Sequence, residues 1–389
     1  MEIVKKYITN RGKLIFPTVF LSLIIILPIL ALIFSVAIID TSNFQYLWDN
    51  LLFEYSIDTI YLIAITSIFS LLFGILPAWY MSTHEFKFKN IYDIFLYLPL
   101  AIPAYIMAFT YSDILSFTGP IQSFSRKYFP DFANLINKDY LQIEVLGIIM
   151  ALSLYPYIYT ACRLSFSLIG SNYINLSRSL GMSRLKTFFK IVIPLSRVAI
   201  FSGLFLVVME VLNEYGAVKY FGVNTFTSGI FRSWYSMGDV ETASLLAVLL
   251  FFIVVFFFST ERYLNSKYKF NYSPNTKKFK NESPSFKNRI IIHLVCLIPI
   301  ILGFLIPLSF IINNVIYEFS RIDFIKVFNL TSNTVIISLI STLIIVLIAV
   351  YFQFLKRILK NKTIKFFNEF ISLTYALPGA VIGLSLILL

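Results

Sequence analysis

The chain has 389 residues, of which 58% are hydrophobic and only 13% charged, whereas ordinary soluble domains carry about 25% charged residues. Its formal net charge is +12, but the basic residues lie in separate loops, which argues against a single nucleic-acid-binding face. Composition therefore excludes a soluble domain and indicates a protein embedded in a membrane.

Nine apolar stretches are long enough to cross a bilayer, which takes about 20 residues per helix. They are continuously apolar and do not alternate with a period of two, so the sequence predicts an all-α polytopic helical bundle and not a barrel. In chain order the predicted spans are 14–39, 56–82, 91–115, 143–168, 195–213, 243–260, 290–315, 332–355 and 367–389.

Positive charge is concentrated in every second loop between these spans. Four basic residues precede the first span. The charged residues of the next loop are all Asp or Glu. Basic residues recur after the second, fourth, sixth and eighth spans, with Arg163 counted in the loop after the fourth. Since basic loops stay inside, we expect a cytoplasmic N-terminus in a bacterial inner membrane. A signal peptide cleaved near Ala37 is the alternative for the first span, although its apolar run exceeds a signal core.

The chain also repeats itself. With Thr59 laid on Thr334 and both segments continued without a gap, Pro103 meets Pro378; we call this spacing the repeat offset. We therefore expect two homologous halves separated by a cytoplasmic linker rich in Lys, Asn, Ser and Pro. The first half has six predicted spans and the second only three. We therefore expect the second half to be truncated and activity to need further C-terminal sequence. The expected divisions are 1–260, 261–289 and 290–389.

The loop after the fourth span carries the most specific pattern. Residues 172–180 and 183–190 are each predicted to form a short amphipathic helix, with Gly181 at the break, where a positive φ causes no Cβ clash. Pro194 then opens the next span. An apolar stripe among Arg and Lys side chains suits docking into a groove of a soluble partner, with a helix lying on anionic lipid as the alternative. The stripe consists of Leu176, Leu180, Leu185, Phe188 and Phe189.

Prolines and carboxylates near or within the spans form a second set of candidates. Pro103 and Pro156 interrupt apolar spans, where a broken backbone ladder can line a path or act as a hinge; a packing kink is the alternative. Glu210 and Glu214 are spaced i, i+4 at the outer end of the fifth span and are candidates for substrate passage or gating, unless they are simply hydrated. Arg232 and Trp234 lie in a predicted outer loop and are candidates for contact with a partner outside the membrane; interfacial anchoring by Trp234 is the alternative.

Catalytic machinery is not evident. A phosphate-binding Gly-x-x-x-x-Gly-Lys-Ser/Thr loop is absent, since the only Gly-Lys pair, Gly12-Lys13, lacks both the first glycine and the hydroxyl residue. His84 and His293 lie far apart, and no Cys/His cluster has the spacing of metal ligands. We expect no catalytic residue, metal or cofactor, and ATP hydrolysis only in a separate subunit.

The basic loop resembles the signature of permease subunits of bacterial ABC importers, which reads Glu-Ala-Ala, three residues, Gly, nine residues, Ile, any residue, Leu-Pro. Here nine residues separate Gly181 from Ile191-Val192-Ile193-Pro194, and Asn175-Leu176-Ser177 stands where the family has Glu-Ala-Ala. The resemblance implies that this loop is the coupling helix of a type I ABC importer permease-like fold. It further implies that the loop contacts an ABC ATPase dimer through Asn175, Leu176, Ser177, Leu180, Gly181, Leu185, Ile191 and Pro194.

Further stretches, 98–105, 155–163, 213–234 and 375–379, resemble the fused two-half permeases of iron(III)-type importers. This resemblance implies that a periplasmic or extracellular binding protein delivers ferric iron, which the chain passes into the cytoplasm. Thiamine-type or other small-solute permeases share the layout, and an ion-coupled secondary transporter or a structural scaffold are rivals from other classes. The expected path or gate residues are Pro103, Tyr105, Pro156, Glu210, Glu214 and Pro378.

Overall fold

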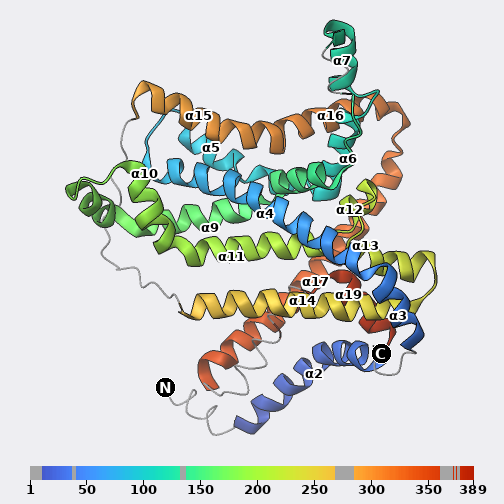
Figure 1. Ribbon diagram of the computed structural model, residues 1–389. Helices are drawn as coiled ribbons and strands as arrows, with labels where there is room; N and C mark the ends of the chain where they lie inside the picture. The colour runs from blue at the N-terminus through green and yellow to red at the C-terminus, as the bar shows by residue number, and fades with distance from the viewer. Residues whose placement is uncertain are drawn as a thin grey trace. The chain divides into compact units, whose positions relative to one another are not determined.

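The regular elements in the described part of the computed structural model are all helical (Figure 1), as the continuous apolar stretches predict. The structure describes residues 11–36, 41–131, 137–267, 284–359, 371, 374 and 377–389. Seven of the helices found there are long and apolar enough to cross a membrane. The all-α membrane fold is therefore confirmed.

Two compact units make up the chain. The larger unit comprises residues 40–311, and the smaller unit combines residues 1–39 with 312–389. In the smaller unit, α2 (Arg11–Val36) packs on α17 (Phe324–Leu359) and α19 (Gly379–Ile387). The remaining helices with bounds after residue 300 are η4 (Ile301–Leu305), α16 (Ile306–Glu318) and η5 (Phe319–Arg321).

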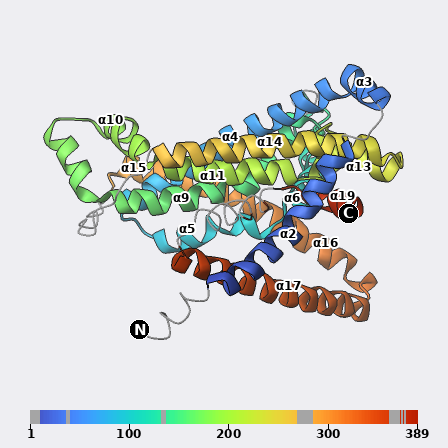
Figure 2. The ribbon, with the colours of Figure 1, turned by 90° about the horizontal axis from the view of Figure 1, so that it is seen from below.

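The larger unit contains the helices on which the candidate sites lie. In chain order these are α3 (Thr41–Asn50), α4 (Leu52–Thr83), α5 (Lys89–Phe95), η1 (Leu98–Ala101), α6 (Ala104–Leu115), α7 (Pro120–Tyr128), α9 (Ile143–Ser179), α10 (Arg184–Thr187), η2 (Phe188–Val192), α11 (Ile193–Asn213), α12 (Gly216–Phe221), α13 (Phe226–Phe231), η3 (Arg232–Ser236), α14 (Val240–Lys267) and α15 (Phe286–Ile300). Helices α4, α9, α11 and α14 run side by side (Figures 1 and 2).

Helices α4 and α9 form the core of this unit and run parallel. Tyr61 near the start of α4 donates a hydrogen bond to Glu144 at the start of α9 (3.0 Å). Arg163, farther along α9, reaches Ser82 near the end of α4 (3.4 Å). Contacts thus advance in the same direction along both helices. We call the end where α4 and α9 finish the basic end, and the end where they begin the far end.

The third predicted span, 91–115, is not one continuous helix. It breaks between η1 and α6, and the segments on either side of the break are bent by 92°. Ile102 is extended (φ −104°, ψ 110°) because the ring of Pro103 disfavours a helical residue before it, and Pro103 itself has no N–H for a helical hydrogen bond. The proline thus interrupts the span, as the sequence predicted for Pro103.

The broken span crosses the bundle once and does not turn back on itself. Its first half contacts α9 near the basic end, where Asp93 lies 3.6 Å from Arg163. At the far end, Phe109 of α6 packs against Tyr220 of α12, with ring centroids 5.6 Å apart. A single crossing is also what the parallel α4 and α9 require of the chain between them. The broken pair therefore makes an eighth span, in addition to the seven unbroken ones.

The expected linker and the ninth predicted span are described only in part. Helix α14 extends to Lys267 and α15 begins at Phe286, so the expected linker at 261–289 is helical at both ends, while its residues 268–283 lie outside the described ones. The ninth predicted span, 367–389, is described only in part, and its described part carries the short α19.

Local structure recurs at the repeat offset. Helix α6 begins at Ala104 and α19 at Gly379, and the proline before each is extended: φ −55° and ψ 145° at Pro103, φ −51° and ψ 139° at Pro378. Each proline carbonyl accepts bonds from the third and fourth following N–H groups at 2.9–3.2 Å. At the same offset the described part of α2 aligns with the segment that begins with α15, yet α2 belongs to the smaller unit and α15 to the larger.

Candidate functional site

The basic loop joins α9 to α11 through a tight turn. Gly181 has φ +70°, as predicted, and no atom lies within 4 Å of the position that a Cβ would take. Around it, Leu180 N–H donates to the carbonyl of Leu176 (3.1 Å) and Met182 N–H to that of Ser177 (3.0 Å), which closes the helix end. The glycine therefore serves the backbone conformation and not close packing.

The two short helices expected at 172–180 and 183–190 are not separate elements. The first is the end of α9, which runs unbroken from the bundle to Ser179. The second is split into α10 and η2, and the chain continues from them directly into α11. Pro194 accordingly lies in the first turn of α11, where a missing N–H is tolerated. The loop is thus an extension of two spans and not a surface helix joined to them by linkers.

A buried hydroxyl pair fixes the two arms of the loop. Ser177 Oγ and Thr187 Oγ1 lie 2.9 Å apart and share a hydrogen bond, and both side chains are buried. Thr187 Oγ1 also donates to the carbonyl of Ser183 (3.1 Å). Because the bond joins α9 to α10, the turn between them is held from inside as well as by its backbone.

Three leucines on this turn are strongly exposed. Leu176, Leu180 and Leu185 expose 60%, 72% and 71% of their surface. Phe189 is exposed as well, but Phe188 is not part of the stripe: it is 5% exposed and packs on Trp79, with ring centroids 5.1 Å apart. Burial of Phe188 corrects the expectation that both phenylalanines belong to the docking face.

The other loop candidates are less informative. The backbone of Asn175 lies in the last turns of α9, while its side chain lies outside the described part of the structure. Ile191 is half-buried within η2. The exposed leucines, defined here as the leucine face, are therefore what the loop offers to a partner.

Five of the six path candidates gather along α6, α9 and α11 of the larger unit. The break before Pro103 is bound by α9, whose buried Ser153 donates to the carbonyl of Ile102 (3.1 Å). Pro156 follows one turn later, but α9 continues through it without interruption. Tyr105 packs against α12, because a Cβ on Gly216 would lie 2.8 Å from that of Tyr105. Pro378 belongs to the smaller unit.

Glu210 and Glu214 do not share a helix face, contrary to their i, i+4 spacing. Helix α11 ends at Asn213, and Glu214 leaves it with φ −74° and ψ 117°. Its carboxylate instead accepts the backbone N–H of Ala217 (2.8 Å) at the start of α12, while Glu210 accepts from Tyr157 OH (3.1 Å). Burial raises the pKa of Glu214, and the neighbouring Glu210 raises it further.

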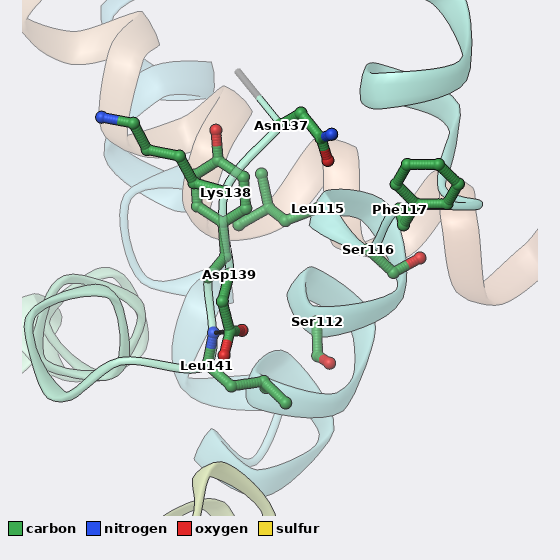
Figure 3. A pocket seen from close by; sticks show the side chains of 9 residues that line it. Ser112, Leu115, Ser116, Phe117, Asn137, Lys138, Asp139 and Leu141 are labelled. Atoms are coloured by element: carbon green, nitrogen blue, oxygen red, sulfur yellow. Dashed lines mark hydrogen bonds between the residues drawn. The ribbon is translucent and has the colours of Figure 1, made fainter. Parts of the chain in front are cut away.

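A cavity of 370 Å³ with a mixed polar and apolar lining opens where α6 ends, at the far end of the bundle (Figure 3). Its walls come from the end of α6 and from the chain before α9, where Asp139 accepts the N–H of Leu141 (2.9 Å). The cavity holds none of the candidates from the sequence. Among the described residues, no group of three or more His, Cys, Asp or Glu side chains could hold a metal ion.

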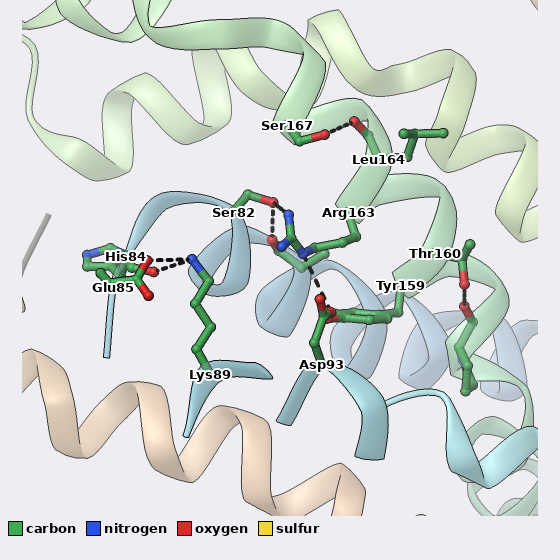
Figure 4. Close-up of polar contacts among 12 residues, drawn as sticks. Ser82, His84, Glu85, Lys89, Asp93, Tyr159, Thr160, Arg163, Leu164 and Ser167 are labelled. Carbon is green, nitrogen blue, oxygen red and sulfur yellow. Dashed lines mark hydrogen bonds and ion pairs between the residues drawn. The ribbon is translucent and has the colours of Figure 1, made fainter. Parts of the chain in front are cut away.

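Sequence reasoning missed one polar cluster. Arg163 was counted with the basic loop, but it lies inside α9 and faces Asp93 of α5 (Figure 4). Asp93, one of two aspartates in the apolar stretch 91–115, was the signal that could have found it, because a charge in a span needs a partner. The partner itself could not be named, since pairing depends on how α5 and α9 align.

Comparison with known proteins points to transport. The family model for "Binding-protein-dependent transport system inner membrane component" matches residues 70–269, half of the chain. A sulfate transport system permease protein of Salmonella typhimurium is 28% identical over 210 residues, 53% of this chain and 72% of that protein. A molybdate/tungstate transport system permease protein of Methanocaldococcus jannaschii is 27% identical over 201 residues, 52% of this chain and 76% of that protein.

An Fe(3+)-transport system permease protein of Haemophilus influenzae matches more of the chain. It is 25% identical over 352 residues, which are 89% of this chain. The chain in turn spans 65% of the length of that relative. The match therefore extends on both sides of the segment covered by the family model.

Proposed function

We propose that this chain, which belongs to the family of binding-protein-dependent transport system inner membrane components, forms the membrane path of an importer that passes ferric iron into the cytoplasm. Membership of the family makes it a permease subunit of an ABC importer with the type I permease fold. Such a subunit works with an ATPase and a substrate-binding protein. Family membership does not give the orientation of the chain in the membrane, the residues that contact the ATPase or the substrate. We propose these three ourselves.

The leucine face is the observation that carries the coupling contact. Leu180 and Leu185 lie on either side of Gly181, and the hydrogen-bonded turn leaves both exposed. Exposed leucines cost free energy in water, about 25 cal/mol per Å², so an apolar groove on a partner would gain from covering them. We infer that the ATPase supplies this groove and that the loop is the coupling helix.

Charge supplies the orientation. The basic end carries Lys87 and Lys89 after α4, and Lys186 and Lys190 in the loop after α9. At the far end, the start of α4 carries Glu54 and Asp58 instead. By the positive-inside rule the basic end faces the cytoplasm, where the ATPase is. The same rule places the N-terminus inside and the cavity of Figure 3 outside.

Two observations favour ferric iron over the oxyanions that other relatives carry. The iron relative matches 89% of the chain, whereas the sulfate relative matches 53%. Glu210 also lies in the last turn of α11 and Glu214 directly after that helix, near the far end, and carboxylates attract a cation and repel sulfate or molybdate. Sulfate remains the second candidate because that relative has the higher identity, 28% against 25%.

The repeat supports a two-half organisation, which we also propose. Helices α6 and α19 begin at positions separated by the repeat offset, and the prolines before them share one conformation. On this basis α15 is the first helix of the second half, although it packs within the larger unit among helices of the first. The first helix of the first half, α2, packs with second-half helices α17 and α19. We infer that the halves exchange their first helices.

The coupling contact is tested by co-purification from native membranes. Leu180→Asp together with Leu185→Asp should abolish recovery of the ATPase with the tagged permease, because charge on the leucine face opposes burial in an apolar groove. Leu141→Asp is the matched control, since this leucine is also exposed but lies at the far end. Unchanged recovery of the ATPase with the double variant would overturn the assignment.

The substrate is tested by uptake into cells that express the whole transporter. Radiolabelled ferric iron should accumulate in an ATP-dependent manner, whereas sulfate and molybdate should neither accumulate nor compete. Glu210→Gln should lower iron uptake more than it lowers the amount of permease in the membrane. Uptake of sulfate without uptake of iron would instead select the oxyanion function.

A further inference from the structure

A charged cluster joins the first half of the broken span to α9 (Figure 4). Asp93 of α5 lies 3.6 Å from Arg163 Nε and accepts a hydrogen bond from the hydroxyl of Tyr159. Arg163 Nη1 donates in turn to Ser82 of α4 (3.4 Å). Tyr159 and Ser82 are buried, and the two charged side chains are partly buried.

The free-energy cost of placing these charges within a span indicates that the cluster does more than pack α5 against α9. Charged groups within a span are expensive, because the surrounding medium cannot hydrate them. Apolar side chains of similar size often stabilise an interior as well as or better than an ion pair does. Uncharged side chains could therefore hold α5 and α9 together, as they hold α4 and α9 where Ile158 packs on Gly74.

A second polar contact lies farther along the same two elements. Ser153 Oγ of α9 donates to the carbonyl of Ile102 (3.1 Å), which the break at Pro103 leaves without a helical partner. On α9, Pro156 lies between Ser153 and Tyr159. The broken span and α9 are thus joined once at the break and once nearer the basic end, and each carries a proline close to the first contact.

The carbonyl that Pro156 leaves unbonded also has a neighbour. Proline has no N–H to donate to Leu152, four residues earlier. Gly303 of η4 approaches that carbonyl so closely that a Cβ on the glycine would lie 2.8 Å from the oxygen. The carbonyl of Leu152 is therefore covered by the backbone of Gly303, where a residue with a Cβ would approach the oxygen too closely.

We propose that Asp93, Arg163 and Tyr159 form a latch that makes α5 and the loop-bearing end of α9 move as one body, with bending taken up at Pro103 and Pro156. This proposal rests on the function proposed above, since the ATPase is what moves the loop. Force applied at the leucine face travels along α9, crosses the latch to α5 and reaches the break. Asp93, Arg163 and Tyr159 are positioning residues, because they affect the translocation path only by way of the two helices that they join.

Neutralising Asp93 and Arg163 together tests the transmission of movement from α9 to α5 separately from the stability of the folded protein. Asp93→Asn or Arg163→Gln alone leaves a partly buried charge without its partner and should lower the yield of folded protein. The double variant carries no orphan charge, so its yield and melting temperature should recover. Because it lacks the ion pair that joins α5 to α9, the double variant should nevertheless transport about tenfold less substrate per ATP hydrolysed. A tenfold change lies within the range of typical coupling free energies.

The measurement uses the complete transporter, with its ATPase and binding protein, in proteoliposomes. Tyr159→Phe removes one hydroxyl only and should lower the transport-to-ATP ratio in the same direction without loss of yield. Wild-type coupling in the double variant would overturn the latch, and so would loss of the ATPase from purified Asp93→Asn protein. Failure of the wild-type permease to bind any ATPase would instead overturn the proposed function.

Discussion

At the scale of single residues, α4 and α9 approach each other closely at two glycines, Gly74 of α4 and Gly147 of α9, where a Cβ would lie 2.6 Å from Ile65 Cγ2. A Cβ on Gly74 of α4 would lie 2.8 Å from the Cβ of Ile158 and 3.0 Å from the backbone N of Tyr159. Two parallel helices can pack this closely only where one of them has no side chain, as is common between membrane helices. The register of α4 on α9 thus depends on Gly74 and on Gly147 together.

Gly74→Val is expected to lower the stability of the folded protein by about 1–3 kcal/mol, because α9 must move away to make room. Thermal unfolding in detergent measures the effect. Ala64→Val adds similar bulk to an exposed position on the same helix and should leave the melting temperature unchanged. Equal melting temperatures for Gly74→Val and wild type would show that the two helices are not held at this distance.

At the scale of elements, the turn between α9 and α10 combines a conformational requirement with an exposed surface. Since no atom lies within 4 Å of the Cβ position of Gly181, any substitution there acts through φ alone. Valine resists a positive φ at a cost of about 1–3 kcal/mol, whereas asparagine adopts it far more readily. The pair of variants therefore isolates backbone conformation from side-chain volume.

Gly181→Val is expected to reduce uptake and stimulated ATP hydrolysis by more than it reduces the amount of permease, since the leucine face would be presented differently. Gly181→Asn should retain most of both activities. Uptake normalised to membrane protein level is the measurement. A valine variant that loses activity and protein level in equal proportion would show that the residue serves folding alone.

The same region also shows where sequence patterns stop being sufficient. Periodicity identified the apolar face of the loop but placed Phe188 on it, because the sequence does not show that Trp79 of α4 ends beside it. Spacing likewise put Glu210 and Glu214 on one helix face, whereas α11 ends between them. In both cases the local pattern was correct and a neighbouring element or a helix end changed its meaning.

At the scale of the whole molecule, the topology depends on the single crossing made by the broken span. Lys87 follows α4 at the basic end and Lys127 lies in α7 beyond α6, and both are exposed. A single crossing puts them on opposite sides of the membrane. A span that turned back at Pro103 would put them on the same side.

Cysteine labelling distinguishes these topologies. In a background where the buried Cys162 and Cys296 are replaced by alanine, Lys127→Cys should react with a membrane-impermeant maleimide added outside intact cells. Lys87→Cys should react only after the membrane is opened. Leu141→Cys, just before α9, should behave like Lys127→Cys. Labelling of both lysine positions from the same side would contradict the crossing.

The sequence by itself determined the properties that belong to one segment at a time. Long apolar runs fix the spanning helices, since each must bury its own backbone polar groups in lipid. The positive φ of Gly181 and the break at Pro103 follow from the covalent structure of glycine and proline. The repeat offset is likewise visible without any contact between the repeated segments.

Only the tertiary structure decided which segments meet. Hydropathy gives each helix its length but not its neighbours, so the parallel packing of α4 on α9 and the placement of α15 in the larger unit could not be read from it. The pairing of Asp93 with Arg163 depends on the register of two helices that are nearly uniform in hydropathy. That register is set by close packing around Gly74 and by a few buried hydrogen bonds, interactions that exist only once the helices are together.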